Sequence, residues 1–267
     1  MSSSIPPIGE PHISFHHAVI KTTWAKQLIQ DLNVEIEQFI ERKPYSISFQ
    51  PEPDRGSYVL QVNLVEHIPH TIPCLIGDIC HNLRASADFC WMGMMRSLNP
   101  QAPKDTLPIC SNAKGIKTIA EKTFEGEILV KILDLLVNRI KAHYDFQSGG
   151  NMMLADLNHL SNWQKHNMLV PSFAVTELGD NTIIKSDDGS RIDLSRAKVN
   201  GRIAQIGGSH AEMTYDSEPT VQVVINLKYL GGYQPINETL LDFHRLMVQS
   251  IQAFCEAFPS PHNPTFD

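Results

Sequence analysis

The chain has 267 residues, 42% of them hydrophobic, and its 22 basic and 29 acidic side chains give a formal net charge of −7. This length allows one elaborated domain or two small ones with a substantial buried core, and we expect one. The acidic balance excludes the broad basic footprint with which duplex-binding proteins displace counterions. We expect that a nucleic acid could bind only locally, at a small basic cluster formed by Arg139, Lys141, Lys165 and His166.

The cysteines and the apolar segments indicate the cellular compartment. Five cysteines, without a C-x-x-C pair, are predicted to be reduced core residues: Cys74, Cys80, Cys90, Cys110 and Cys255. The first residues lack the features of a signal peptide, and no segment approaches the roughly 20 apolar residues of a membrane span. We therefore expect a cytoplasmic location and no membrane partner.

The first half of the chain alternates helical and strand patterns. After a tail over residues 1–13, apolar residues at every fourth position predict a long helix that ends before Pro44. They are Ile20, Trp24, Leu28, Leu32, Ile36 and Ile40. Alternating polarity predicts a β-hairpin over residues 45–65. Thr71 is expected to cap the next helix, which runs to about Leu98.

Further helices are predicted at residues 114–122, 125–143 and 152–170, with Gly149-Gly150 between the last two. Short β-type runs follow, and Asp180-Asn181 and Asp188-Gly189 supply hairpin turns. These runs are residues 173–176, 182–185, 191–194, 202–206 and 221–227. A closing helix is expected at 236–258, before a tail at 259–267.

These elements predict a mainly helical α+β fold in which the two terminal helices close one bundle. We expect a single domain over residues 1–267. It would consist of a helical core at 14–170, a β-rich elaboration at 171–232 and the closing helix.

The helix predicted after Thr71 has two faces of different chemistry. At about 100° per residue, His81, Arg84 and Asp88 fall within roughly 60°, whereas its apolar residues lie on the other side. The helix predicted at 152–170 is similar, with Asn158, Asn162 and Lys165 on one face beside His159 and His166. Two polar stripes of this kind predict that the helices face each other across a shared site.

The shared site has residues that fit acid–base chemistry on an anionic ligand. Arg84 and Lys165 would hold a phosphate or carboxylate, and His81 or His166 would transfer a proton, since the pKa of histidine lies near neutrality. Asn82, Asp88 and Asn162 would bind substrate. No cofactor or metal is expected, because the histidines lack a complete zinc ligand set at a recognised spacing.

Two motifs carry a resemblance. Gly77-Asp78-x-x-His81-Asn82-Leu83-Arg84-x-x-x-Asp88 and Asn162-x-x-Lys165-His166 resemble those of a widespread bacterial group of proteins with no assigned activity. The typical R-x(4)-H helix of that group is similar to the motif of HEPN-type helical ribonucleases. The resemblance implies a HEPN-like helical bundle and metal-independent cleavage of RNA. Here Phe89 stands where the histidine is expected, so His81 or His166 would have to replace it.

Two functions therefore remain open. One is a metal-independent ribonuclease, or a protein that binds a related phosphate ligand, in which His81, Arg84 and His166 are catalytic. The other is a non-enzymatic interaction module, dimeric through an exposed helical face, in which the same stripes form a structural network.

Overall fold

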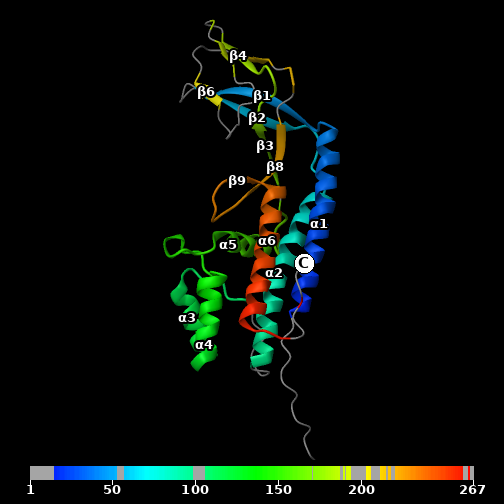
Figure 1. The fold of residues 1–267 in the computed structure, drawn as a ribbon. Helices are drawn as coiled ribbons and strands as arrows, with labels where there is room; N and C mark the ends of the chain where they lie inside the picture. The colour runs from blue at the N-terminus through cyan, green and yellow to red at the C-terminus, as the bar shows by residue number, and fades with distance from the viewer. Residues whose placement is uncertain are drawn as a thin grey trace, which may run out of the picture.

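The computed structural model describes most of the chain. The described residues are 15–52, 57–98, 106–169, 171–186, 189, 191–193, 203–205, 211–214, 216–217, 220–260 and 264. They form a mainly helical α+β fold, as the sequence predicts, with a helical body and small antiparallel sheets at one end of it (Figure 1).

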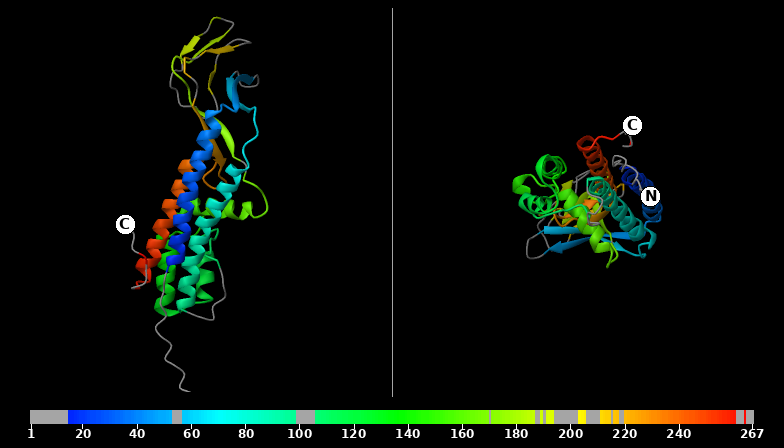
Figure 2. Two further views of the ribbon diagram at one scale, coloured as in Figure 1. Left: turned by 90° about the vertical axis from the view of Figure 1, so that its right-hand side faces the viewer. Right: turned by 90° about the horizontal axis from the view of Figure 1, so that it is seen from below.

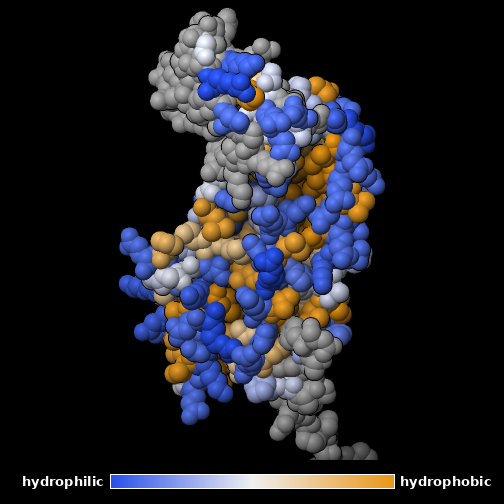
Figure 3. All heavy atoms as spheres, turned by 45° about the horizontal axis from the view of Figure 1, so that its top comes forward, coloured by the Kyte–Doolittle hydropathy of each residue, from blue (hydrophilic) through white to orange (hydrophobic). Residues whose placement is uncertain are grey.

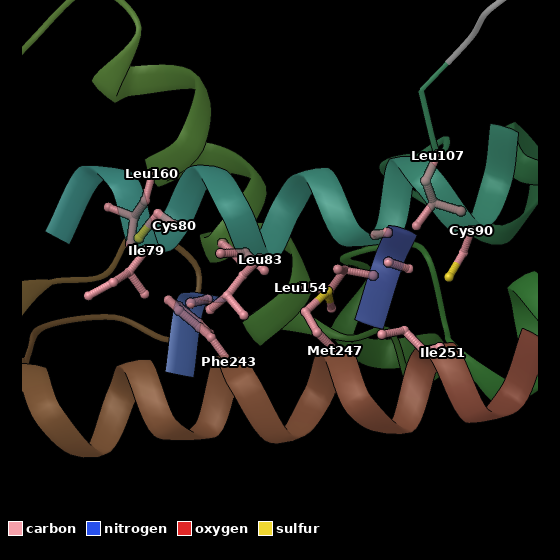
Figure 4. Packing of buried hydrophobic residues seen from close by; sticks show 14 of the residues in the cluster. Ile79, Cys80, Leu83, Cys90, Leu107, Leu154, Leu160, Phe243, Met247 and Ile251 are labelled. Atoms are coloured by element: carbon pink, nitrogen blue, oxygen red, sulfur yellow. The ribbon is translucent and has the colours of Figure 1, made fainter. Parts of the chain in front are cut away.

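Three long helices make the centre of the helical body. α1 (His16–Glu41), α2 (Thr71–Leu98) and α6 (Ile236–Ala257) pack against one another, and both side views show them running together (Figures 1 and 2). The expected closure of the bundle by its first and last helices is confirmed. Figure 4 shows the interface between α2 and α6, where Ile79 and Leu83 of α2 lie near Phe243 and Met247 of α6.

The buried face of α1 differs from the predicted stripe. Ile20 and Trp24 are 50% and 53% exposed, whereas Leu28, Leu32 and Ile36 are buried. A step of four residues advances about 400°, so a four-residue repeat drifts by about 40° per step around the helix. From Ile36 back to Ile20 the drift reaches about 160°, which carries the first members of the stripe to the solvent side.

α2 is the central helix and is buried on most sides. Its buried residues include polar ones, Asn82, Arg84 and Ser86, among apolar neighbours. The expected capping role of Thr71 is wrong, because Thr71 is the first helical residue and its hydroxyl donates to Glu35 of α1 at 2.8 Å. The helix is therefore tied to α1 at its beginning.

The middle of the chain forms shorter helices beside this bundle. α3 (Ala113–Glu121) and α4 (Gly126–Leu133) are followed by a π-helical segment, Asp134–Arg139, and a 3₁₀ turn, Phe146–Ser148. α5 (Met152–Gln164) is preceded by Asn151, whose side chain accepts a hydrogen bond from the backbone N–H of Leu154 at 3.0 Å. This is a standard N-cap, which satisfies a free helical N–H group.

α5 is shorter than predicted, since it ends at Gln164 rather than at residue 170. The backbone N–H groups of His166 and Asn167 both donate to the carbonyl of Trp163, which closes the helix with a turn. The three residues directly after Gln164 are polar, so the next turn of a longer helix would add no apolar side chain before Met168.

The strands form three small antiparallel sheets. The first joins β1 (Tyr45–Glu52), β2 (Ser57–Leu64) and β6 (Ile203–Gln205), with Tyr45 opposite Leu64 in the predicted hairpin. The second joins β3 (Ser172–Glu177), β8 (Thr220–Asn226) and β9 (Tyr233–Pro235). The third joins β5 (Arg191–Asp193), β4 (Ile183–Ser186) and β7 (Ala211–Thr214).

Two details of the sheets depart from the sequence analysis. β7 and β9 are not among the predicted strands, because they are only four and three residues long. Asp180-Asn181 forms a turn, with Asn181 at φ 50°, but it links two sheets instead of closing a hairpin. β3 pairs with β8, whereas β4 pairs with β5 and β7.

β8 leads back into the bundle and helps to position the site. Gly231 and Gly232, both at positive φ, turn the chain from β8 into β9, which runs directly into α6. Positive φ is unstrained for glycine. The second sheet therefore sits between the helical body and the other two sheets (Figure 1).

The surface carries scattered hydrophobic residues. Figure 3 shows them between hydrophilic residues on one face of the molecule. Exposed examples are Ile20, Trp24, Val130 and Trp163. Of the helices in the described part of the chain, none combines the length and the apolarity needed to cross a membrane.

Candidate functional site

Arg84 is the centre of a buried polar network. Arg84 and Asp88 lie one turn apart on α2, so their side chains share a face, and Nη1 of Arg84 donates to Oδ1 of Asp88. Nη2 donates to the carbonyl of Leu107 at 2.8 Å, and Nε donates to Oδ1 of Asn158 at 2.9 Å. The backbone N–H of Leu107 donates to the same Asp88 oxygen at 2.8 Å.

This network engages all three nitrogens of the guanidinium group. Arg84 is only 7% exposed, and Asp88 balances its charge. Burial of an arginine is tolerated when it is paired and hydrogen-bonded in this way. The network joins α2 to α5 through Asn158 and to the segment after α2 through Leu107.

α2 and α5 are in contact, as the two polar stripes predict, and α5 crosses the bundle in both side views (Figures 1 and 2). A second contact lies at Gly77, where an added Cβ atom would meet the side chain of Gln164 at 2.3–2.6 Å. Glycine at this position lets the end of α5 approach the backbone of α2.

Asn82, predicted to bind substrate, holds α1 against α2. Its side chain is buried, accepts a hydrogen bond from Nζ of Lys21 at 2.9 Å and donates to the carbonyl of Asp78 at 2.7 Å. The sequence analysis did not single out Lys21, because it lies in a helix that was interpreted only as an amphipathic packing element.

The other predicted site residues lie on the surface. His81, Asn162, Lys165 and His166 are all exposed. Lys165 Nζ donates to Oδ1 of Asn162 at 3.0 Å, and His166 lies in the turn beyond the end of α5. The predicted set is thus divided between a buried group around Arg84 and an exposed group near the end of α5.

Phe89 occupies the position where the resemblance expects a histidine. Its half-buried ring lies 5.8 Å from the ring of His17 on α1, measured between centroids. The residue therefore contributes to packing between α1 and α2.

The local basic cluster is also divided. Arg139 forms an ion pair with Glu256 of α6, while Lys141 and Lys165 are exposed. Because Glu256 neutralises it, Arg139 contributes no net positive charge to this part of the surface.

Asp156 is a residue of the site that sequence reasoning missed. It is completely buried on α5, and its two carboxylate oxygens accept the backbone N–H groups of Tyr229 at 2.9 Å and Leu230 at 2.8 Å. Such charge-assisted hydrogen bonds are stronger than neutral ones. The available signal was an acidic residue on an otherwise apolar helical face, between Ala155 and Leu157.

Asp156 places an aromatic cluster beside α5. The ring of Tyr229 lies 4.9 Å from that of Tyr144 and 6.3 Å, edge to face, from that of His159. The His159 ring is in turn 6.0 Å from Trp163, and Nζ of Lys228 lies 5.2 Å from the centre of the Tyr229 ring. Rings and cations are thus gathered where α5 meets the end of β8.

Burial makes the thiols of Cys80 and Cys90 poor nucleophiles. Burial raises the pKa of Cys80 to about 12 and, together with Cys255, raises the pKa of Cys90 well above its ordinary value. None of the five cysteines forms a disulfide, as expected for reduced residues. The expected core position is correct for Cys80 and Cys90, whereas Cys110 and Cys255 are half-buried against the core and Cys74 is exposed. Within the described ranges, no three His, Cys, Asp or Glu residues are placed to hold a metal ion.

Comparisons with known proteins find no relative of this chain. No family model, no curated protein and no solved structure matches this chain.

Proposed function

We propose that this protein is a non-enzymatic interaction module, in which the polar stripes of α2 and α5 serve as a structural network. The observation that carries the proposal is that each nitrogen of the buried Arg84 guanidinium group donates a hydrogen bond, to Asp88, Asn158 or the Leu107 carbonyl. These bonds hold two helices and a loop together, which favours a structural role for the group over the binding of a phosphate.

The positions of the histidines support the same proposal. A ribonuclease of the HEPN type needs a cation and a proton-transfer group that act on the same phosphate. In this chain Arg84 is buried, whereas His81 and His166 are exposed, and Phe89 packs against His17. The cation and the histidines therefore lie in different environments.

The competing function is cleavage of RNA with Arg84 and a histidine. The test is incubation of the purified full chain with single-stranded and structured RNA, with and without EDTA. We expect no cleavage by the wild-type chain, by His81→Ala or by His166→Ala. Cleavage that falls by about 10²–10⁴-fold in either histidine variant, the usual share of general acid–base catalysis, would overturn the proposal.

Arg84→Lys separates the two functions further. Lysine cannot reproduce the fork of donors that reaches three acceptors, so this variant should be less stable than the wild type. A variant that melts like the wild type and loses an RNA-dependent activity would place Arg84 in a site instead of a scaffold.

A further inference from the structure

A stripe of exposed apolar side chains runs along α1. Ile20, Trp24 and Val34 are 50%, 53% and 49% exposed. At about 100° per residue they lie within roughly 80° around the helix axis, whereas the buried residues of α1 face the bundle. The side view in Figure 1 and the end-on view in Figure 2 place α1 at the outer edge of the bundle, so the stripe is open to a partner.

The stripe has the spacing of a helix that packs along another helix. Positions 20, 24, 27, 31 and 34 alternate steps of four and three residues, the repeat of coiled-coil seams, over about 21 Å or four turns. Gln27 and Asp31 lie in the middle, and the Gln27 amide donates to Oδ1 of Asp31 at 3.0 Å. A polar position in such a seam fixes the register of the partner helix. The spacing thus favours a helical partner over an extended one.

A groove of about 460 Å³ between α1 and α2 continues the stripe. Val34 and Leu75 supply an apolar side chain from each helix, and the exposed Cys74 lies in the same groove. The other lining residues are polar: Asp31, Glu35, Thr71 and Asp78. Amphipathic helices insert their apolar residues into grooves of this kind. We call the stripe of Ile20, Trp24 and Val34, together with this groove, the α1–α2 face.

The charges that line the groove have one sign. Asp31, Glu35 and Asp78 are carboxylates, and no basic side chain is among the lining residues. Asp31 accepts the Gln27 amide and Glu35 accepts the Thr71 hydroxyl, which fixes these carboxylates in place without neutralising them. Within the described residues none of the three carboxylates forms an ion pair. Charge complementarity therefore favours a positively charged partner and opposes a polyanion.

We infer that the α1–α2 face binds an amphipathic helix of a partner protein, in which lysine or arginine flanks an apolar ridge. The ridge packs along Trp24 and Val34, and the basic side chains pair with the carboxylates of the groove. Tryptophan often dominates the binding energy of an interface, while complementary charges select the partner and its orientation. The inference rests on the proposed function, because it gives the interaction module a docking surface and a partner chemistry.

The first test measures the binding of a fluorescein-labelled helical peptide to the full chain by fluorescence anisotropy. The probe is about 18 residues long, enough to form a helix, with leucine in a three–four repeat and lysine at the other positions. A second peptide has glutamate in place of every lysine. We expect the basic peptide to bind and the acidic peptide not to bind.

Substitution of Trp24 tests the apolar part of the face. Trp24→Ala should weaken binding of the basic peptide about 5- to 30-fold, the range for residues that matter at an interface. Trp24→Phe should retain most of the affinity, which separates loss of the ring from a folding defect. Trp163→Ala is the matched control, because Trp163 is 49% exposed but lies on α5, and it should bind like the wild type.

The second test reverses one charge of the groove. Asp31→Lys should weaken binding of the basic peptide about fivefold and allow the acidic peptide to bind, because the charge that faces the peptide changes sign. Glu127→Lys, which changes the net charge equally at an exposed position of α4, should leave both results unchanged. An equal loss in the two variants would show general attraction to an acidic protein and overturn the inference.

Three further results would overturn it. The first is the absence of binding to the basic peptide, and the second is equal affinity for both peptides. The third is self-association in analytical ultracentrifugation that Trp24→Ala abolishes, which would make the occupant a second copy of this chain. None of these results affects the proposed function, which fails instead if the chain cleaves RNA. Conversely, cleavage that depends on His166 would leave the binding result at Trp24 standing.

Discussion

Asp88→Ala is the most direct test of the network around Arg84. The substitution removes the carboxylate that neutralises the Arg84 guanidinium and that accepts the backbone N–H of Leu107. Arg84 keeps its hydrogen bonds to Asn158 and Leu107, but its charge is left without a counterion at a site where its side chain is 9% exposed.

The size of the effect follows from the burial of the pair. Removing one partner of a buried ion pair costs about 3–5 kcal/mol of unfolding free energy. Asp88 is 22% exposed and water can reach part of the vacated space, so we expect the lower limit of about 3 kcal/mol. At roughly 2–4 °C per kcal/mol for a large domain, thermal unfolding followed by circular dichroism should show a Tm lower by about 6–12 °C.

The chain supplies a matched control in Asp242→Ala. Asp242 pairs with Arg245 on α6, but those side chains are 40% and 66% exposed. An exposed pair contributes roughly 0–1 kcal/mol, so Tm should change by no more than a few degrees. If the two variants melt alike, the buried network does not contribute the stability assigned to it.

Three other predictions concern packing and titration. Gly77→Ala should change the free energy of unfolding by no more than about 1 kcal/mol, because the new Cβ meets the flexible side chain of Gln164 while alanine favours the helix over glycine; a loss of many degrees in Tm would show that Gln164 cannot move aside. Burial and the neighbouring cations Lys26 and Arg245 lower the pKa of His244 in the folded protein. As the pH falls, the unfolded chain therefore binds a proton at this histidine at a higher pH than the folded protein does. Stability should therefore decrease as pH falls below about 6.5, the unfolded value, and His244→Gln should flatten this dependence in urea titrations at pH 5–7; an unchanged slope would contradict it. Thiol labelling of the folded protein at pH 8 should modify Cys74 and spare Cys80, and rapid modification of Cys80 would show that its site is open to solvent.

The sequence by itself determined the elements of the fold. The hairpin at 45–65, the helix from Thr71 to Leu98 and the closing helix are present because each depends on a local pattern: alternation for strands, a 3.6-residue repeat for helices, and proline or glycine at the ends. The same patterns marked Arg84, Asp88 and Asn158 as residues of two polar helical stripes, opposite the apolar faces of the helices.

Only the tertiary structure decided what those polar residues do. Periodicity places side chains on a face but does not say whether water, a ligand or another helix covers that face. Arg84 and Asn82 are covered by α5, α1 and the segment at Leu107, whereas His81 on the same helix remains exposed. Asp156 and Tyr229 lie 73 positions apart, and their contact depends on β8 returning the chain to α5. Contacts of this kind depend on how the elements pack, which local patterns do not contain.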